Sequence, residues 1–490
     1  MSSSEPLVGA DAPAAVSPSS ALRWHMGCII GCYAVFAINW AVIATIAPFF
    51  PDSDAGLAVG PVIVGLVFAA YPFATALFTP VVPCVLGRLG NRCGIHLGLL
   101  ICSGSALAFG AAPSVVGVDR PRALSAALLA TRAVGGTAAA VAEAGALAVL
   151  STLEGLGQHL GKLLAGIEVV IGVAMSIGFA VGGGLYVVGG GTPFGAFFFP
   201  FIVWGVATLA AIPLLLNISS GPKPAAEAAA AEEEDEAAAK AAAQREPVAG
   251  VTVGFVTTAV AITLSAVIYQ ALTPVLEPHL DVAPYNLTEA QVGGVFTSST
   301  VSYMLAALPI GAVVDRYAAG PNGKSSLKLM QLFGYATLVA GTLAIGPGCD
   351  ALIAAELPRV ALWVNLASVF FCFGAGIAFT IVPTLPDMRE EAGGDAASEE
   401  RQAKVCALWN GLYSLGAGIG PLISAPLVQA QGFTRFCVLF AYASAAMAAL
   451  LLGAAARARL HARLARSTAT LAVNFPPLSA GDLRPPTGLP

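Results

Sequence analysis

The sequence contains very little charge for its length. Only 10% of its 490 residues are Asp, Glu, Lys or Arg, whereas 57% are hydrophobic and the mean hydropathy is +0.81. A soluble protein of this size needs more charge to cover its surface, so the composition excludes that class. No basic stripe is present that would bind nucleic acid, and one acidic segment supplies much of the net charge of -5.

Several kinds of chemical motif are also missing. The nine cysteines have no metal-ligand spacing and most lie in apolar runs, so they predict neither a disulfide framework nor a metal site. No phosphate-binding loop or nucleophile–base pair occurs, so we expect no enzyme, no nucleotide-driven pump and no cofactor. The first 22 residues lack the apolar core of a signal peptide, so the first membrane helix must provide targeting.

The chain is instead dominated by long apolar runs. Each run is about long enough to cross ~30 Å of hydrocarbon at ~1.5 Å per residue, and the runs form two sets of about six. We therefore predict an all-α integral membrane protein with two pseudo-symmetric six-helix bundles. The runs lie near 25–50, 61–86, 93–113, 123–150, 163–188, 194–217, 250–277, 290–312, 326–347, 361–386, 403–430 and 433–456.

The polar segments divide the chain and indicate its orientation. Most Lys and Arg residues fall on the side of the membrane that also holds the segment between the bundles, so the positive-inside rule predicts that both termini are cytosolic. The expected parts are a disordered tail, the first bundle, an acidic Ala-rich linker, the second bundle, and a basic then Pro-rich tail. They cover residues 1–23, 24–217, 218–248, 249–458 and 459–490 respectively.

An internal repeat relates the two halves. The segment Val64–Phe68 resembles Val292–Phe296, and the same offset relates Arg88 to Arg316 without a gap. Both segments open the second helix of their half, and both arginines close it. Two related halves are typical of secondary transporters, which use them to alternate access to a central site.

A loop motif gives the first family resemblance. The segment that begins at Gly311 and ends with Asp315 and Arg316 resembles the loop between the second and third helices of each half in the major facilitator superfamily. The resemblance implies a gating role, in which the acid and the arginine contact helix ends and hold one face closed. The first half has Arg88 and Gly90 but a glycine in place of the acid, so an ordinary basic turn is the alternative there.

The chain is more specifically similar to the vesicular amine transporter branch of that superfamily, and to its polyamine-transporter-like members. The likeness covers roughly residues 24–456. Monoamine members have acids in helices 1 and 11 where this chain has Asn39 and Asn410, and this departure favours the polyamine-like members. The motifs are Pro48-Phe49-Phe50-Pro51, Glu168-Val169-Val170-Ile171-Gly172, Leu276-Glu277-Pro278, Ile381–Asp387 and Ser414–Pro421, the last of which ends in Gly420 and Pro421.

Ionisable groups inside the apolar runs are few, and each is costly in a membrane unless it is paired or hydrated. Glu168 lies in a Gly-rich helix at a position where the family has a glutamate, and we expect it to bind a proton or an ammonium. Glu277 and Asp387 end helices 7 and 10 and are similar candidates. The alternatives are a structural hydrogen bond for Glu168, a solvated helix end for Glu277, and pairing with Arg389 for Asp387.

Arg132 and Glu143 share the fourth predicted helix. They are eleven residues apart, which is about three turns, so they project from nearly one face. Arg132 begins a segment that resembles the fourth-helix motif associated with proton coupling in antiporters; a fixed ion pair with Glu143 is the alternative. Aromatic residues could cage an ammonium or simply pack, and they are Tyr33, Trp40, Tyr269, Trp409 and Tyr413.

These features, with the resemblance, predict a proton-coupled antiporter of organic cations, polyamines or related amines, in a vesicle or vacuole membrane. Its partners would be a small cationic amine, protons and the lipid bilayer, and we expect a monomer driven by the proton gradient. One alternative is a multidrug exporter of the plasma membrane, which would share fold and motifs. Another is a transport-inactive receptor or scaffold, which the two asparagines would favour.

Overall fold

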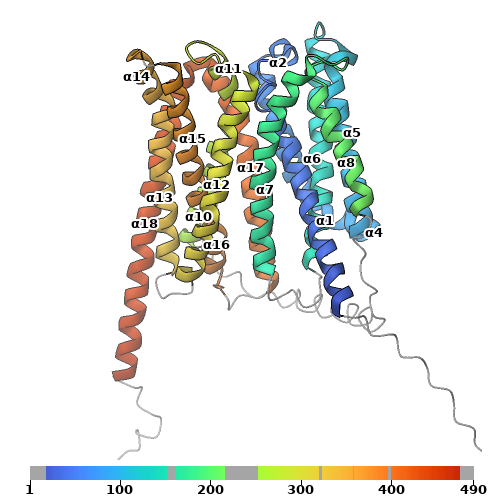
Figure 1. The fold of residues 1–490 in the computed structure, drawn as a ribbon. Helices are drawn as coiled ribbons and strands as arrows, with labels where there is room; N and C mark the ends of the chain where they lie inside the picture. Colours follow the sequence, from blue (N-terminus) through green and yellow to red (C-terminus); the bar gives the residue numbers. More distant parts are fainter. Residues whose placement is uncertain are drawn as a thin grey trace, which may run out of the picture.

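The computed structural model of the chain is a bundle of long helices that run roughly side by side (Figure 1). It describes residues 18–151, 160–215, 252–318, 323–356, 358–394 and 399–474, and within these ranges no β-strand occurs. The predicted all-α class is therefore confirmed. The predicted linker 218–248 and residues 1–17 and 475–490 of the two predicted tails lie outside the described residues.

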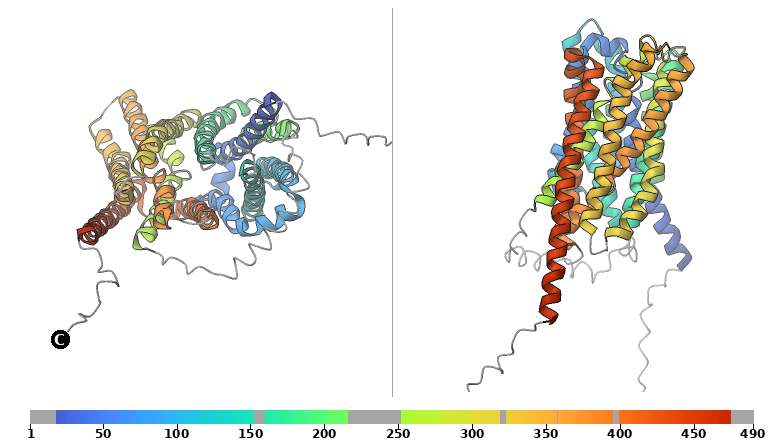
Figure 2. Two further views of the ribbon diagram at one scale, coloured as in Figure 1. Left: turned by 90° about the horizontal axis from the view of Figure 1, so that it is seen from below. Right: turned by 90° about the vertical axis from the view of Figure 1, so that its left-hand side faces the viewer.

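The helices form two groups, which separate clearly when the bundle is seen along its axis (Figure 2). The first half consists of α1 (Pro18–Thr45), α2 (Asp54–Val59), α3 (Pro61–Phe78), α4 (Val82–Leu89), α5 (Asn91–Val116), α6 (Pro121–Ser151), α7 (Leu160–Gly189) and α8 (Phe199–Leu215). The second half consists of α10 (Val253–Ala271), α11 (Leu276–Asp281), α12 (Glu289–Ala318), α13 (Gly323–Leu343), α14 (Cys349–Ala354), α15 (Arg359–Ile381), α16 (Thr384–Glu391), α17 (Glu399–Gln431) and α18 (Phe433–Asn474).

The predicted apolar runs correspond to these helices. Within the described ranges, 11 helices are long and apolar enough to cross a membrane. The remaining run, 194–217, contains the shorter apolar helix Phe199–Ile212. Many large apolar side chains point outward, for example Leu77, Val360 and Val364, which are 79%, 70% and 61% exposed. Such a surface is suited to lipid and would be costly in water.

Two of the breaks that occur near a proline in the membrane helices create the short helices that hold candidate residues. Pro274 lies between α10 and α11, and Pro383 lies between α15 and α16. Proline removes a backbone donor and clashes with the preceding turn, so the long helix cannot continue unchanged. As a result Glu277 lies on α11 and Asp387 lies on α16, at opposite ends of the bundle (Figure 1).

We name the ends of the bundle after their short helices, the α2–α11 end and the α4–α16 end. Along α3, α7, α12 and α17, contacts join the two halves from the α2–α11 end to the middle of the helices. Phe179 of α7 stacks on Phe296 of α12 with ring centroids 4.8 Å apart, and the hydroxyl oxygens of Ser176 and Thr300 are 2.6 Å apart.

The internal repeat has a structural counterpart at this interface. Gly65 of α3 faces the carbonyl oxygen of Pro421 on α17, and Gly293 of α12 faces the carbonyl oxygen of Phe179 on α7. A side chain on either glycine would collide with backbone, so both positions need glycine for helices to approach this closely. The two equivalent glycines therefore mark equivalent contacts, α3 with α17 and α12 with α7.

Helix α18 continues well beyond the bundle at the α4–α16 end (Figures 1 and 2). The predicted apolar run stops at residue 456, but the helix reaches Asn474, because the following residues are mostly Ala, Leu and Arg, which favour helix. Where this helix passes α13, the Arg459 Nε donates a hydrogen bond to the Ser325 hydroxyl at 2.9 Å.

Candidate functional site

A cavity lies between the two halves of the bundle. Helices α1, α3, α6 and α7 line it from the first half, and α10 and α17 line it from the second. A second pocket shares Trp40, Met175, Asn410 and Tyr413 with the first and extends it toward α12 and α15. Because both halves contribute walls, relative movement of the halves would change its shape and access.

Arg132 and Glu143 both line this cavity. The sequence spacing had placed them on nearly one face of α6, and they lie on one wall. The Arg132 side chain is buried, its Cζ lies 4.9 Å from the ring centre of Tyr71 and 5.8 Å from that of Phe109, and its Nε has no hydrogen-bond partner among the described residues. Within the same part of the chain, no ion pair joins Arg132 to Glu143.

Asn39 and Asn410 approach the cavity from opposite halves. Asn39 is buried on α1, and its Nδ2 donates a hydrogen bond of 3.4 Å to Glu143 Oε1. Asn410 on α17 lines both pockets. Asn39 stands where the resemblance expects an acid in helix 1. Its side chain instead donates a hydrogen bond to the Glu143 carboxylate of α6.

Four of the five candidate aromatic residues gather at the extension of the cavity: Trp40, Tyr269, Trp409 and Tyr413. Trp409 and Tyr413 stack with ring centroids 6.0 Å apart, and Trp40 lies 6.4 Å from Tyr413. The Trp409 Nε1 donates to the Thr384 hydroxyl at 2.8 Å, which fixes the ring. Ring faces held in this way can attract an organic cation.

Glu277 lies at the α2–α11 end, where it joins the two halves. It is 2% exposed, and its Oε2 accepts a hydrogen bond of 3.0 Å from the backbone N–H of Asp52, in the turn before α2. Burial, with the charge of Asp52 adding to it, raises the pKa of Glu277 to about 10. Burial and the nearby Asp281 also raise the pKa of Asp52, to about 6, although its side chain contacts the Glu277 carboxyl.

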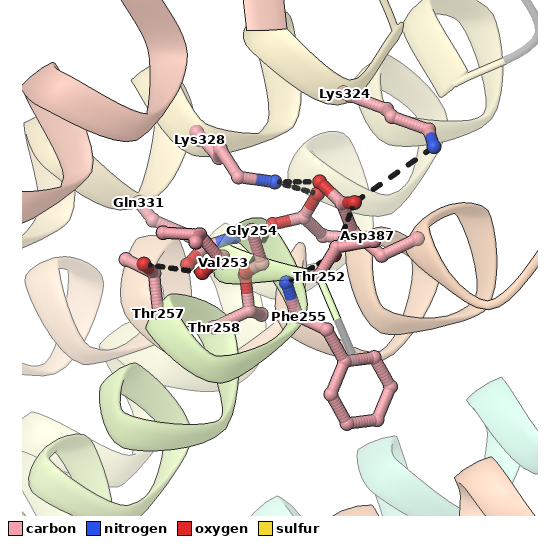
Figure 3. A network of polar contacts seen from close by, with 11 residues as sticks. Thr252, Val253, Gly254, Phe255, Thr257, Thr258, Lys324, Lys328, Gln331 and Asp387 are labelled. Atoms are coloured by element: carbon pink, nitrogen blue, oxygen red, sulfur yellow. Dashed lines mark hydrogen bonds and ion pairs between the residues drawn. The ribbon is translucent and has the colours of Figure 1, made fainter. Parts of the chain in front are cut away.

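Asp387 lies in a polar network at the α4–α16 end of the second half (Figure 3). Its carboxylate is fully buried and forms an ion pair of 2.7 Å with the Lys328 ammonium, and Gln331 Nε2 donates to it at 3.0 Å. Lys328 also pairs with Glu391 at 2.8 Å. Asp387 does not line either pocket described above, and the cation that neutralises it is Lys328, on a different helix from Arg389.

The two copies of the loop motif differ in detail. Arg88 is exposed at the end of α4, and Gly90 has φ 78°, so glycine permits the sharp turn into α5. In the second copy Gly311 is half-buried within α12 and Arg316 is exposed in its last turn. The Asp315 side chain lies outside the described residues.

The other candidates also lie on membrane helices. Glu168 is on α7, but its side chain lies outside the described residues. Gly420 and Pro421 are buried in α17, where a side chain on Gly420 would meet the Val267 carbonyl oxygen at 2.5 Å. The sequence patterns did not indicate three residues: Lys328, Asp52, and Gln270 of α10, which lines the cavity. Lys328 and Gln270 were detectable as isolated polar residues within apolar runs. Asp52 was not, because its role depends on its contact with Glu277, which the sequence does not indicate.

Comparison with known proteins assigns the family. The sequence model described as Major Facilitator Superfamily matches residues 29–393, which is well over half of the chain. The chain belongs to the Major Facilitator Superfamily. It is therefore a multi-pass membrane transporter of that superfamily rather than an enzyme. No curated protein matches the sequence.

Solved transporter structures share the superfamily fold at low sequence identity. The nucleoside transporter NupG has a TM-score of 0.59 at 13% identity, over 88% of this chain and 98% of NupG. A partially occluded inward-open structure of the xylose transporter XylE from E. coli has 0.59 at 13%, over 88% and 98%. A peptide transporter POT in complex with sulfate has 0.61 at 13%, over 89% and 94%. Likeness at this level establishes the fold alone.

Proposed function

We propose that this superfamily member is a proton-coupled antiporter of small organic cations, polyamines or related amines. The observation that supports it is the Glu143 carboxylate, which lines a cavity between the two halves together with the aromatic rings of Trp40 and Tyr413. A carboxylate held away from bulk water needs a positive partner, and either a proton or an ammonium can supply it. Because one carboxylate binds one of them at a time, the two can exchange.

The aromatic rings extend this argument to the rest of the substrate. An ammonium or alkylammonium gains from the ring faces of Trp40, Trp409 and Tyr413, and the apolar side chains of Met175 and Ile381 suit its carbon chain. Asn410 adds a neutral hydrogen-bonding group from the second half. Such walls favour an organic cation over an inorganic one.

Alternating access would move the bound group across the membrane. The halves contact each other at the α2–α11 end, so opening that end requires them to separate along α3–α17 and α7–α12. If the α4–α16 end faces the cytosol, as the basic residues predict, this conformation is the one that closes the non-cytosolic side. In an acidic vesicle or vacuole, protons that leave the lumen through the transporter would then drive amines into the lumen.

The transporters with similar folds differ in what they carry. The solved structures include nucleoside and peptide transporters and a D-xylose–proton symporter. The D-xylose–proton symporter agrees with coupling to protons in this fold. The direction of coupling and the amine substrate rest on the cavity residues and on the sequence resemblance.

The test uses purified full-length protein in liposomes with an imposed pH gradient. We expect gradient-driven uptake of spermidine, less of a monoamine and none of an organic anion. Glu143→Gln should lower the initial rate at least about tenfold, because it removes the charge that binds proton and ammonium. Asp119→Asn, which changes an exposed acid 78% accessible in its side chain, is the matched control and should leave the rate unchanged.

Three results would contradict parts of this proposal. Full uptake by the Glu143→Gln variant would remove Glu143 from the mechanism. Uptake of many unrelated cations at similar rates would favour a multidrug exporter. Absence of uptake for every amine, by protein that is folded and correctly inserted, would favour the receptor or scaffold. Glu168→Gln and Glu277→Gln extend the same assay to the other two predicted carboxyl groups.

A further inference from the structure

The cavity contains a buried positive group without a counter-charge. Arg132 is 5% exposed, and within the described ranges neither a carboxylate nor a hydrogen-bond acceptor pairs with its guanidinium. The rings of Tyr71 and Phe109 provide the contacts that the structure does show. Cation–π contact offsets part of the cost of burying the charge, but it leaves the buried Nε–H donor without an acceptor.

A negative group lines the same cavity. The Glu143 carboxylate accepts a long hydrogen bond from Asn39 and forms no ion pair within the described part of the chain. Eleven residues of α6 separate Arg132 from Glu143, which is roughly 16 Å along a helix axis. The two opposite charges are thus too far apart to neutralise each other directly, and both face the space that a substrate would occupy.

The wall between the two charges is mainly apolar and aromatic. Ala44, Met175 and Phe179 contribute from the first half, and Tyr413 and Ala417 contribute from the second. Because the backbone positions of Arg132 and Glu143 are roughly 16 Å apart along the helix axis, a ligand that contacts both side chains must be elongated. An extended molecule with polar ends and an apolar middle would match all three regions.

We infer that the preferred substrate is an elongated amine whose far end carries a carboxylate, with its ammonium at Glu143 and its carboxylate at Arg132. This inference rests on the proposed function for the ammonium end and adds the opposite end. Arginine binds a carboxylate with two parallel N–H donors, so an anionic group at Arg132 satisfies donors that are otherwise unpaired. A diamine of the same length would place its second ammonium beside the guanidinium, which costs affinity.

Three ligands of equal chain length test the inference: 8-aminooctanoate, 1,8-diaminooctane and octanoate. Binding to the purified full-length protein is measured by calorimetry at neutral pH. We expect 8-aminooctanoate to bind the wild-type protein roughly tenfold or more tightly than either of the others, because only it satisfies both charges. Arg132→Gln should abolish its advantage over the diamine, and Glu143→Gln should abolish its advantage over octanoate.

The wild-type comparison decides the inference even if a variant fails to fold. Equal or tighter binding of 1,8-diaminooctane would overturn the carboxylate assignment, and spermidine uptake in the liposome assay would then leave the proposed function intact. An unchanged preference in a folded Arg132→Gln variant would also overturn it. Arg132→Lys, which retains the charge but loses the two-donor geometry, should give an intermediate preference. Failure of every amine in the uptake assay would instead defeat the proposed function.

Discussion

At the residue scale, the structure compensates buried charge in three different ways. Asp387 is neutralised by Lys328 at 2.7 Å. Glu277 lies among other acids, and its raised pKa means that it retains its proton near neutral pH. Arg132 lies over two aromatic rings without a counter-charge. Of these three groups, Arg132 is the one whose charge has no partner inside the cavity, so it is the group that a bound ligand would neutralise.

Lys328 provides a prediction about stability. Lys328→Met leaves Asp387 buried without its cation, and breaking a buried ion pair in this way costs about 3–5 kcal/mol. Lys324→Met is the matched control, because Lys324 is 44% exposed in its side chain and lies 3.8 Å from Glu391, where a surface pair contributes about 0–1 kcal/mol. Thermal unfolding in detergent should show a large loss for the first variant and a small loss for the second.

A second substitution separates this explanation from lost packing. Adding Asp387→Asn to Lys328→Met removes the uncompensated charge and should restore much of the stability. If the single Lys328→Met variant unfolded at the temperature of the Lys324→Met variant, or if the double variant were no better than the single, the ion pair would not be the stabilising feature.

The sequence revealed the candidate residues within one helix better than their partners on other helices. The joint placement of Arg132 and Glu143 follows from helix periodicity alone. The partner of Asp387 depends on which helices are neighbours, and Arg389 was the nearer cation in sequence while Lys328 is the one in contact. Asp52 and Glu277 are 225 residues apart and belong to different halves, so no local sequence pattern indicates that they are in contact.

At the element scale, close backbone contact holds the two halves together. A side chain on Gly183 of α7 would collide with the carbonyl oxygen of Glu289, at the start of α12. The neighbouring Gly184 has open space around it. Two adjacent glycines on one helix therefore have different roles, and only Gly183 is required by the contact between halves.

Gly183→Ala should shift the protein toward the conformation that is open at the α2–α11 end. The added methyl costs about 1–3 kcal/mol in the closed conformation, or roughly 5–150-fold in the closed-to-open ratio. The distance between spin labels at Leu57→Cys and Val282→Cys, in a background without the native cysteines, would measure the shift. Gly184→Ala gains the same helix propensity and should not move the distribution; equal effects from both would contradict the steric explanation.

The extent of the membrane helices was predictable from apolar run length, but their breaks were less so. Run 250–277 contains α10, the break and the start of α11, because Pro274 interrupts a composition that stays apolar throughout. The end of α18 was also missed, since hydropathy reports where lipid ends and not where helix ends.

At the scale of the whole molecule, opening of the α2–α11 end separates Asp52 from Glu277 and admits water. Their pKa values should then fall from about 6 and about 10 toward the ordinary 3.8 and 4.5. Closing the end therefore binds protons, so the closed conformation is favoured as the pH falls. Asp52 contributes between 3.8 and about 6, and Glu277 contributes between 4.5 and about 10. The other acids near this contact are Asp54, Asp281 and Glu289, and His279 lies on the same short helix as Glu277.

The same spin-label pair tests this pH dependence. Between pH 4.5 and 6.5 the wild-type closed-to-open ratio should fall with rising pH, by up to about tenfold per pH unit for each titrating group. Asp52→Asn should remove the Asp52 share of the response in this window, roughly halving the slope below pH 6, and leave the share of Glu277, which continues above the window. Asp54→Asn, at an exposed acid two residues further, is the control. An unchanged response in the Asp52→Asn variant would show that other groups bind the protons.

The charged groups are divided unequally between the duplicated bundles. Arg132 and Glu143, which line the cavity, belong to the first, whereas Lys328 in the second pairs with Asp387 and Glu391. Changes at Arg132 or Glu143 would therefore alter which charges a ligand must carry, whereas changes at Lys328 or Asp387 would act on the stability of the second bundle.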